Sequence, residues 1–129
     1  MITSLYAGIL ALLFIKITAD TILARRRLQI SLGSGPNNEI ASLVSAHSNF
    51  SSYVIYFLFL TYLVEQSGIA PGYLIHIIAA AFTLGRLSHY VAFSGKRMNF
   101  KLRVLGMQLT IVPMVILALT NILIFIKSM

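Results

Sequence analysis

Four long apolar runs, separated by short polar breaks, make up this chain of 129 residues. A helix needs roughly 20 apolar residues to cross a membrane, and the runs predict spanning helices at about residues 3–27, 38–66, 71–94 and 102–127. With 58% hydrophobic residues and a mean hydropathy of +0.89, the chain is too apolar for a soluble domain of this size. The sequence therefore predicts an all-α, integral membrane four-helix bundle that forms one domain over residues 1–129.

Positive charge is concentrated in the first and third polar breaks. Seven of the ten Lys and Arg residues lie at Arg25–Arg27 or between positions 96 and 103, whereas the second break, around Gln66–Gly72, has none. Loops rich in Lys and Arg stay on the cytoplasmic side of a membrane. We therefore expect both basic loops to face the cytoplasm, and both termini and the second break to lie outside.

The composition excludes several classes of chemistry. The chain has no cysteine, so disulfide exchange, iron–sulfur clusters and a protein thiolate nucleophile are ruled out. Its three His and three acidic residues show no metal-ligand spacing, and we expect no metal site. In a soluble protein the net charge of +7 would favour nucleic acid. Here the basic residues flank spans, so lipid headgroups are the expected partner and nucleic acid is not.

The second predicted helix carries its polar residues on one face. They follow a heptad-like spacing of four, three, four, three and four: Asn38, Ser42, Ser45, Asn49, Ser52 and Tyr56. Polar side chains within a membrane helix avoid lipid by packing against other helices or by lining a wet cavity. Two interpretations therefore stay open for this polar seam: close helix packing through small residues, or a polar ligand pocket that opens to the cytoplasm.

Several cations converge on the predicted cytoplasmic half. Arg86 and His89 are three residues apart and share a helix face, and an Arg at this depth needs a partner inside the bundle. The other polar residues expected nearby are Arg25–Arg27, Glu39, Ser45, Asn49, Ser52 and Arg103. Such a cluster suits an anionic guest with several carboxylates or a phosphate. The alternative is that these residues pair with one another and with headgroups.

Five motifs in this sequence resemble one known family. They are Ser45-Ala46-His47-Ser48-Asn49, Leu84-Gly85-Arg86-Leu87-Ser88-His89-Tyr90, Gly95-Lys96, Arg103 with Pro113 ten residues later, and Phe14-Ile15-Lys16 through Asp20. Together they resemble the MAPEG proteins, the membrane-associated proteins in eicosanoid and glutathione metabolism, and especially their small bacterial members. The resemblance covers most of the chain, and its most specific piece is the Gly-Arg-x-x-His segment.

This resemblance implies a homotrimer in a bacterial inner membrane, with the second helix near the threefold axis and glutathione, the co-substrate, between neighbouring subunits. Asn49 would bond the tripeptide, Arg86 and His89 would shape the pocket, and Arg25 would meet a carboxylate. Arg103 would stabilise the glutathione thiolate, because a thiol with a pKa near ~8.5 is mostly protonated at neutral pH. The implied activity is that of a glutathione transferase or peroxidase acting on a lipophilic electrophile.

Four positions depart from the family pattern. Ser45 stands where the family often has Arg, and Ser52 stands where it usually has a Glu that meets the glutathione ammonium. Phe93 and Met107 occupy places that are Tyr in some members. The candidates for a replacement carboxylate are Glu39 and Asp20.

Two other functions stay open from the sequence. One is a catalytically silent, MAPEG-like trimer that binds lipid or another anion. The other is a small four-span transporter, which needs a carboxylate deep in its first helix to exchange protons for a cationic drug. Asp20 lies close to the cytoplasmic end and has Lys16 one turn away, which argues against the transporter.

Overall fold

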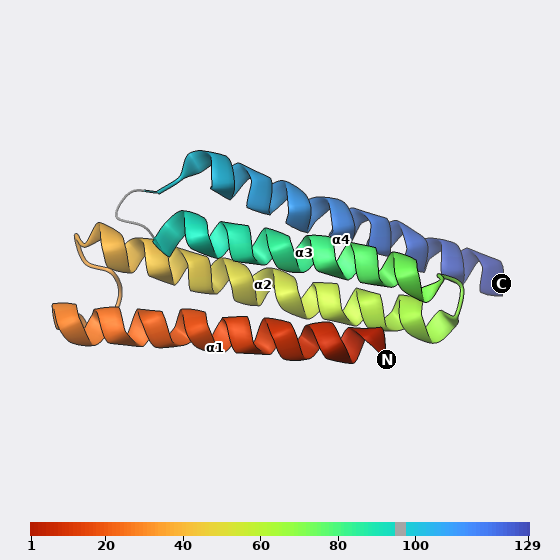
Figure 1. Cartoon of the computed structure of the whole chain (residues 1–129), viewed down its shortest axis with the longest axis horizontal. Helices are drawn as coiled ribbons and strands as arrows, with labels where there is room; N and C mark the ends of the chain where they lie inside the picture. The colour runs from red at the N-terminus through yellow and green to blue at the C-terminus, as the bar shows by residue number, and fades with distance from the viewer. Residues whose placement is uncertain (95–97) are drawn as a thin grey trace.

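Four antiparallel helices lie side by side in the computed structural model, which describes residues 1–94 and 98–129. They are α1 (Ile2–Leu28), α2 (Asn38–Ser67), α3 (Gly72–Ser94) and α4 (Phe100–Ser128). Both termini lie at the same end of the bundle as the α2–α3 turn (Figure 1). The described residues contain helices and no strands, which confirms the predicted all-α fold. The Gly95-Lys96 motif lies outside the described residues.

Local capping explains where the helices begin and end. Asn37 precedes α2 and its side chain accepts hydrogen bonds from the backbone N–H groups of Glu39 and Ile40, which satisfies donors that the first helical turn leaves free. Asn99 caps α4 in the same way. Gly68 ends α2 in the left-handed conformation, with a φ of 66° that favours glycine. Both ends of α2 and the start of α4 therefore coincide with polar breaks in the sequence and have specific backbone partners.

The core lies between α2 and α3, each of which packs against the other three helices. Phe57 of α2 stacks on Phe82 of α3 with ring centroids 3.7 Å apart. Leu10 and Ile17 of α1 and Leu117 of α4 belong to the same buried cluster. This arrangement brings the polar residues of α2 beside those of α3 and α4.

Much of the outer surface is apolar. Leu12, Ile15 and Phe125 are each more than 60% exposed, and all four helices are long and apolar enough to cross a membrane. In water such a surface would be unfavourable, whereas lipid tails accept it without cost. The chain is therefore a membrane protein in which α1 and α4 present large apolar faces.

A close approach between α3 and α4 depends on two glycines. A Cβ atom added to Gly106 would lie 2.8 Å from the carbonyl oxygen of Gly85 and 2.8 Å from the backbone nitrogen of His89. A Cβ atom added to Gly85 would lie 2.8 Å from the Cβ atom of Leu109. Because neither position has room for a side chain, the two backbones can meet. This contact fixes the position of α4 beside Arg86, three residues before His89.

Candidate functional site

The side chain at the centre of the site is that of Arg86, which α3 carries into the bundle with 1% of its surface exposed. Its Nη1 donates to Asn49 Oδ1 at 2.7 Å, and its Nη2 donates to Thr110 Oγ1 at 2.6 Å. The rings of Tyr53 and Phe82 lie 5.4 and 5.9 Å from the guanidinium carbon. The partners that the sequence required inside the bundle are therefore neutral groups, supplied by α2, α3 and α4.

No carboxylate among the described residues balances the charge of Arg86. The ion pairs in residues 1–94 and 98–129 join Lys16 with Asp20 and Arg27 with Glu39. The Arg86 Nε atom is buried and has no hydrogen-bond partner there. A buried cation that is held by neutral groups alone carries a large desolvation cost. The site therefore has a net positive charge in its interior, which favours an anion nearby.

A groove of about 550 Å³ runs along α2 beside this network. We call it the α2 groove, and its lining residues are Val44, Ser45, Ser48, Asn49, Ser52 and Tyr53. Ser45 and Ser52 are exposed and Asn49 is half-buried. Much of the polar seam predicted from the sequence thus opens to the outside of the single chain instead of packing in its core.

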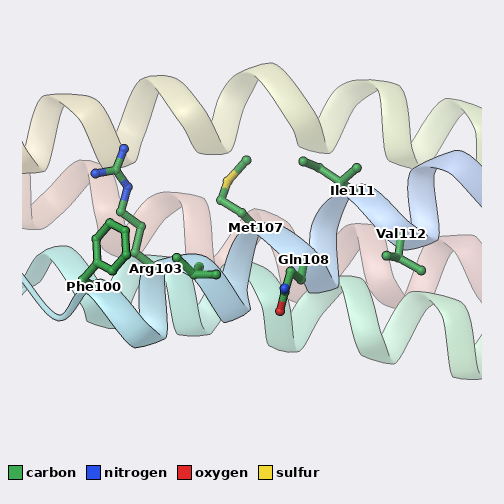
Figure 2. Close-up of a pocket in the computed structure, with 7 residues that line it drawn as sticks. Phe100, Arg103, Met107, Gln108, Ile111 and Val112 are labelled. Carbon is green, nitrogen blue, oxygen red and sulfur yellow. The ribbon is translucent and has the colours of Figure 1, made fainter.

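A second groove, of about 440 Å³, lies on α4 and is mainly apolar. We call it the α4 groove, and its lining residues are Phe100, Arg103, Val104, Met107, Gln108, Ile111 and Val112. Figure 2 shows the side chains of Arg103, Met107 and Ile111 extending from the same face of α4. The α4 groove therefore combines one cationic group, the Arg103 guanidinium, with mainly apolar side chains.

Arg103 is exposed at the start of α4. Its Nη1 donates to Met98 Sδ at 3.6 Å, and its guanidinium carbon lies 5.5 Å from the centroid of the Phe93 ring. The same ring lies 5.0 Å from that of His89, which is buried with 4% of its surface exposed. The structure therefore leaves Arg103 open to a ligand and keeps His89 behind it as a packing group.

Two of the predicted site residues make their polar contacts elsewhere. Arg25 donates to the backbone oxygens of Ile30 and Gly33 at 3.3 and 2.9 Å, so it holds the end of α1 to the following loop. Glu39 forms an ion pair with Arg27. Neither lines the α2 groove or the α4 groove. The structure thus brings Asn49 and Arg86 into direct contact, whereas Arg25 binds the α1–α2 connection and Glu39 of α2 pairs with Arg27 of α1.

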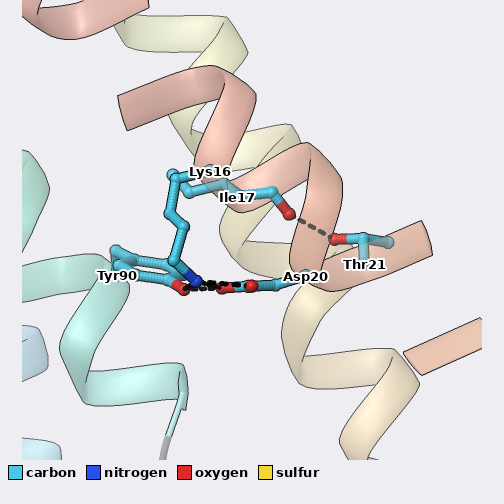
Figure 3. Close-up of polar contacts among 5 residues, drawn as sticks. All are labelled: Lys16, Ile17, Asp20, Thr21 and Tyr90. Atoms are coloured by element: carbon cyan, nitrogen blue, oxygen red, sulfur yellow. Dashed lines mark hydrogen bonds and ion pairs between the residues drawn. The ribbon is translucent and has the colours of Figure 1, made fainter. Parts of the chain in front are cut away.

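Asp20 is also engaged, together with a residue that the sequence interpretation missed. Lys16 Nζ lies 2.5 Å from Asp20 Oδ1, and the hydroxyl of Tyr90 donates to Asp20 Oδ2. Figure 3 shows the three side chains meeting between α1 and α3. Lys16, which the sequence places one turn from Asp20, is therefore its ion-pair partner. Because Tyr90 adds a third partner, Asp20 ties two helices together.

Thr110 is the other important residue that the sequence did not assign to the site. It is fully buried; its hydroxyl accepts from Arg86 and donates to the Gly106 carbonyl at 2.7 Å. A signal was present, because a Thr one turn from a Gly in an apolar helix often marks a helix contact. Nothing in the sequence indicates that this contact faces Arg86.

Comparison with known proteins agrees with the four-helix membrane fold. The model of the MAPEG family matches residues 3–123. The chain is 30% identical over 121 residues to the inner membrane protein YecN of Escherichia coli K12, an alignment that covers 94% of this chain and 90% of YecN. YecN of E. coli strain CFT073 matches to the same extent. With four helices able to span a membrane and a family match over nearly its whole length, the chain belongs to the MAPEG family.

Proposed function

We propose that this MAPEG-family membrane protein is a glutathione-dependent transferase or peroxidase that acts on a lipophilic electrophile from the bilayer. In this proposal Arg103 stabilises the glutathione thiolate, whose sulfur attacks the electrophile. The family is generally associated with glutathione, which makes this tripeptide the first co-substrate to test.

The observation that carries the proposal is the setting of Arg103. It is an exposed cation, and its contacts, Met98 and the Phe93 ring, carry no negative charge. A cation in a partly desolvated groove favours the thiolate over the thiol. The apolar remainder of the α4 groove, including Val104 and Ile111, suits a lipophilic acceptor.

The α2 groove is the proposed seat of the tripeptide. Asn49, with Ser45 and Ser52 beside it, presents polar groups to the ligand, while Arg86 supports the groove from inside through its bond to Asn49. His89, which is buried against Phe93, would shape the pocket behind Arg103. These polar groups face away from the core of the single chain, and a lipid environment would penalise them. A homotrimer that places α2 against a neighbouring subunit would remove this penalty and enclose the site.

The test of this function is the substitution Arg103→Leu. We expect it to abolish the ultraviolet absorbance of bound thiolate near neutral pH, because the stabilising charge is lost. Turnover with a model electrophile should fall about a hundredfold, which corresponds to roughly 2.7 kcal/mol of transition-state stabilisation. The control is Lys101→Leu, which removes an exposed cation from the same first turn of α4 and should leave both signals in place.

A specific observation favours a second candidate function, a catalytically silent trimer that binds lipid or another anion. The two carboxylates that were candidates for meeting the glutathione ammonium, Asp20 and Glu39, are already paired with Lys16 and Arg27. If the wild-type protein neither binds glutathione at millimolar concentration nor shows a thiolate signal, the enzyme proposal fails and the silent trimer replaces it. The contacts of Asp20 also argue against a proton-exchanging transporter.

A bacterial inner membrane is the proposed location, since YecN is named an inner membrane protein. The distribution of Lys and Arg favours an orientation with both basic loops in the cytoplasm and both termini outside. In this orientation Arg103 and the α2 groove lie in the cytoplasmic half, where glutathione is available.

A further inference from the structure

A methionine thioether lies beside the guanidinium of Arg103. The Sδ atom of Met98 accepts a hydrogen bond from Arg103 Nη1 at 3.6 Å, and the Phe93 ring lies 5.5 Å from the guanidinium carbon. A thioether sulfur is a weak acceptor. The contact with Met98 therefore leaves Arg103 able to bind a stronger acceptor, such as a thiolate.

The sulfur of Met98 is in reach of dissolved reagents. Met98 directly precedes the cap of α4, and 46% of its surface is exposed. Peroxides oxidise a methionine thioether to the sulfoxide, and sulfoxide reductases reverse this reaction. Because the exposed sulfur also contacts Arg103, its oxidation changes the surroundings of the guanidinium.

The oxidation replaces a weak acceptor with a strong one. The Met98 sulfur attacks the terminal oxygen of a hydroperoxide, an S–O bond forms and the O–O bond breaks. The proton of the attacked oxygen passes to the departing alkoxide, which leaves as an alcohol. Sulfur loses two electrons and the peroxide gains them, so the step needs no other reactant. The new oxygen carries partial negative charge, and the flexible methionine side chain can turn it toward Arg103.

We propose that Met98 is a redox modification site: its oxidation by a hydroperoxide creates a sulfoxide oxygen that binds the Arg103 guanidinium and competes with the thiolate for it. The effect on catalysis rests on the proposed function, in which Arg103 stabilises the thiolate. The contact between the two side chains does not depend on that function. An excess of hydroperoxide would then inhibit the protein until a reductase restores Met98.

The first experiment measures the accessibility of Arg103 without glutathione. Purified protein in detergent is treated with tert-butyl hydroperoxide or left untreated, and then reacts with phenylglyoxal, which modifies accessible guanidinium groups. Mass spectrometry reports the sulfoxide at Met98 and the adduct at each Arg. Sulfoxide formation should slow the reaction of Arg103 at least about threefold, as expected for one added hydrogen bond. Arg26, which is exposed in the last turn of α1, is the internal control and should react equally in both samples.

Two substitutions of Met98 separate the sulfoxide from other oxidative damage. Met98→Leu keeps an apolar side chain of similar size without an oxidisable sulfur, so peroxide should no longer slow the reaction of Arg103. Met98→Gln supplies a carbonyl oxygen without oxidation, so Arg103 should react slowly even in the untreated protein. Met129→Leu removes a methionine at the opposite end of α4 (Figure 1), and this variant should respond to peroxide as the wild type does.

Met107 is the alternative target of the peroxide. Its sulfur accepts a hydrogen bond from Arg86 Nη2 at 3.8 Å, and it lines the α4 groove together with Arg103. Met107 is half-buried within α4, whereas Met98 is exposed. If peroxide still slows the reaction of Arg103 in Met98→Leu but no longer does so in Met107→Leu, the inference is wrong.

Turnover connects the modification with the proposed function. After the peroxide is removed, activity with glutathione and a model electrophile should be about tenfold lower than in the untreated wild type, as for the loss of one charge-assisted contact. A methionine sulfoxide reductase should restore it. Met98→Leu, compared with its own untreated sample, should keep its activity.

Absence of the sulfoxide at Met98, equal reactivity of Arg103 with and without it, or equal inactivation of the wild type and Met98→Leu would each overturn the inference. A slowed reaction of Arg103 in a protein without glutathione-dependent turnover would support the modification site and reject the proposed function. The two proposals can therefore fail separately.

Discussion

Arg86 is the residue on which three helices depend. Replacing it with Leu removes the donor to Asn49 and the donor to Thr110 together. Since a buried acceptor that loses its partner costs about 1–3 kcal/mol, we expect Arg86→Leu to lower the free energy of unfolding by roughly 2–3 kcal/mol. Denaturant unfolding of the purified protein in micelles, followed by circular dichroism, measures this loss.

The control for this prediction is a substitution of the other arginine of the proposed site, Arg103. Arg103→Leu removes an Arg that is exposed and has only weak contacts with Met98 and Phe93. It should change the free energy of unfolding by less than about 0.5 kcal/mol, as surface substitutions do. Equal destabilisation by the two substitutions would contradict the assignment of Arg86 to the interior and Arg103 to ligand contact.

Tyr90 gives a second test at the scale of single residues. Its hydroxyl donates to Asp20 between α3 and α1, and a hydrogen bond to a charged group contributes about 1.5–3 kcal/mol. Because Asp20 is partly exposed and also bonds Lys16, we expect Tyr90→Phe to cost about 1 kcal/mol. Tyr73→Phe, at an exposed position in the first turn of α3, is the matched control.

A double-mutant cycle with Asp20→Asn identifies the partner of Tyr90. If the hydroxyl acts through Asp20, the effects of the two substitutions are not additive. Additive losses would show that Tyr90 stabilises the protein without this bond.

The sequence named the main site residues but could not pair them. An Arg within an apolar helix must find a partner, and Asn49 stood out because it is polar at a seam position. Which of the polar residues meets Arg86 depends on the rotation of α2 and α4 about their axes, and hydropathy does not specify rotation. Tyr90 was missed for a related reason, since Lys16 and Asp20 already satisfied each other within one helix.

At the scale of elements, the contact between α3 and α4 depends on Gly106. A methyl group there would lie 2.8 Å from the carbonyl oxygen of Gly85 and 2.8–2.9 Å from the backbone nitrogen and Cβ atom of His89, so the helices must move apart. We expect Gly106→Ala to lower the free energy of unfolding by about 1–3 kcal/mol, the usual cost of overpacking. It should also weaken ligand binding, because Thr110 moves with α4 and its hydrogen bond holds Arg86 in place beside Asn49.

Gly8→Ala is the control for this substitution. Gly8 lies inside α1 with nothing within 4 Å of an added Cβ atom, so the better helix propensity of Ala should be neutral or stabilising by up to about 1 kcal/mol. Unfolding measurements on both variants under the same conditions decide the matter. A Gly106→Ala protein as stable as Gly8→Ala would mean that α4 is not held in close contact with α3.

The helices themselves were readable from the sequence because lipid imposes a simple requirement. A span must be apolar over a given length, so each polar break near Gly33, Gly68 and Asn99 marks a connection. The observed helices begin and end within two residues of the predicted ranges. The close approach of α3 and α4 could not be predicted in the same way, since Gly85 and Gly106 indicate a contact only when the two helices are known to meet there.

At the scale of the whole molecule, the polar seam of α2 predicts self-association. Ser45 is exposed on the single chain and would face a neighbouring subunit in the proposed trimer. Small residues allow helices to approach closely, so Ser45→Leu should weaken the trimer. Native mass spectrometry or cross-linking in mild detergent measures this change, with Ser4→Leu, an exposed residue near the start of α1, as the control. If Ser45 faces lipid instead, leucine would be tolerated and the oligomeric state would not change.

The orientation of the bundle follows from the positive charge at one end. The α1–α2 connection follows Arg25–Arg27, whereas the α2–α3 connection has no Lys or Arg, so we expect the first inside and the second outside. Because the chain has no native cysteine, single substitutions Ser34→Cys and Gln66→Cys report each side without background. Gln66 is preferable to Gly68, whose φ of 66° disfavours a side chain. A membrane-impermeant thiol reagent applied to intact cells should label Cys at position 66, and should label position 34 only after the cells are opened. The reverse pattern would place Arg103 and the α2 groove on the outer side, away from cytoplasmic glutathione.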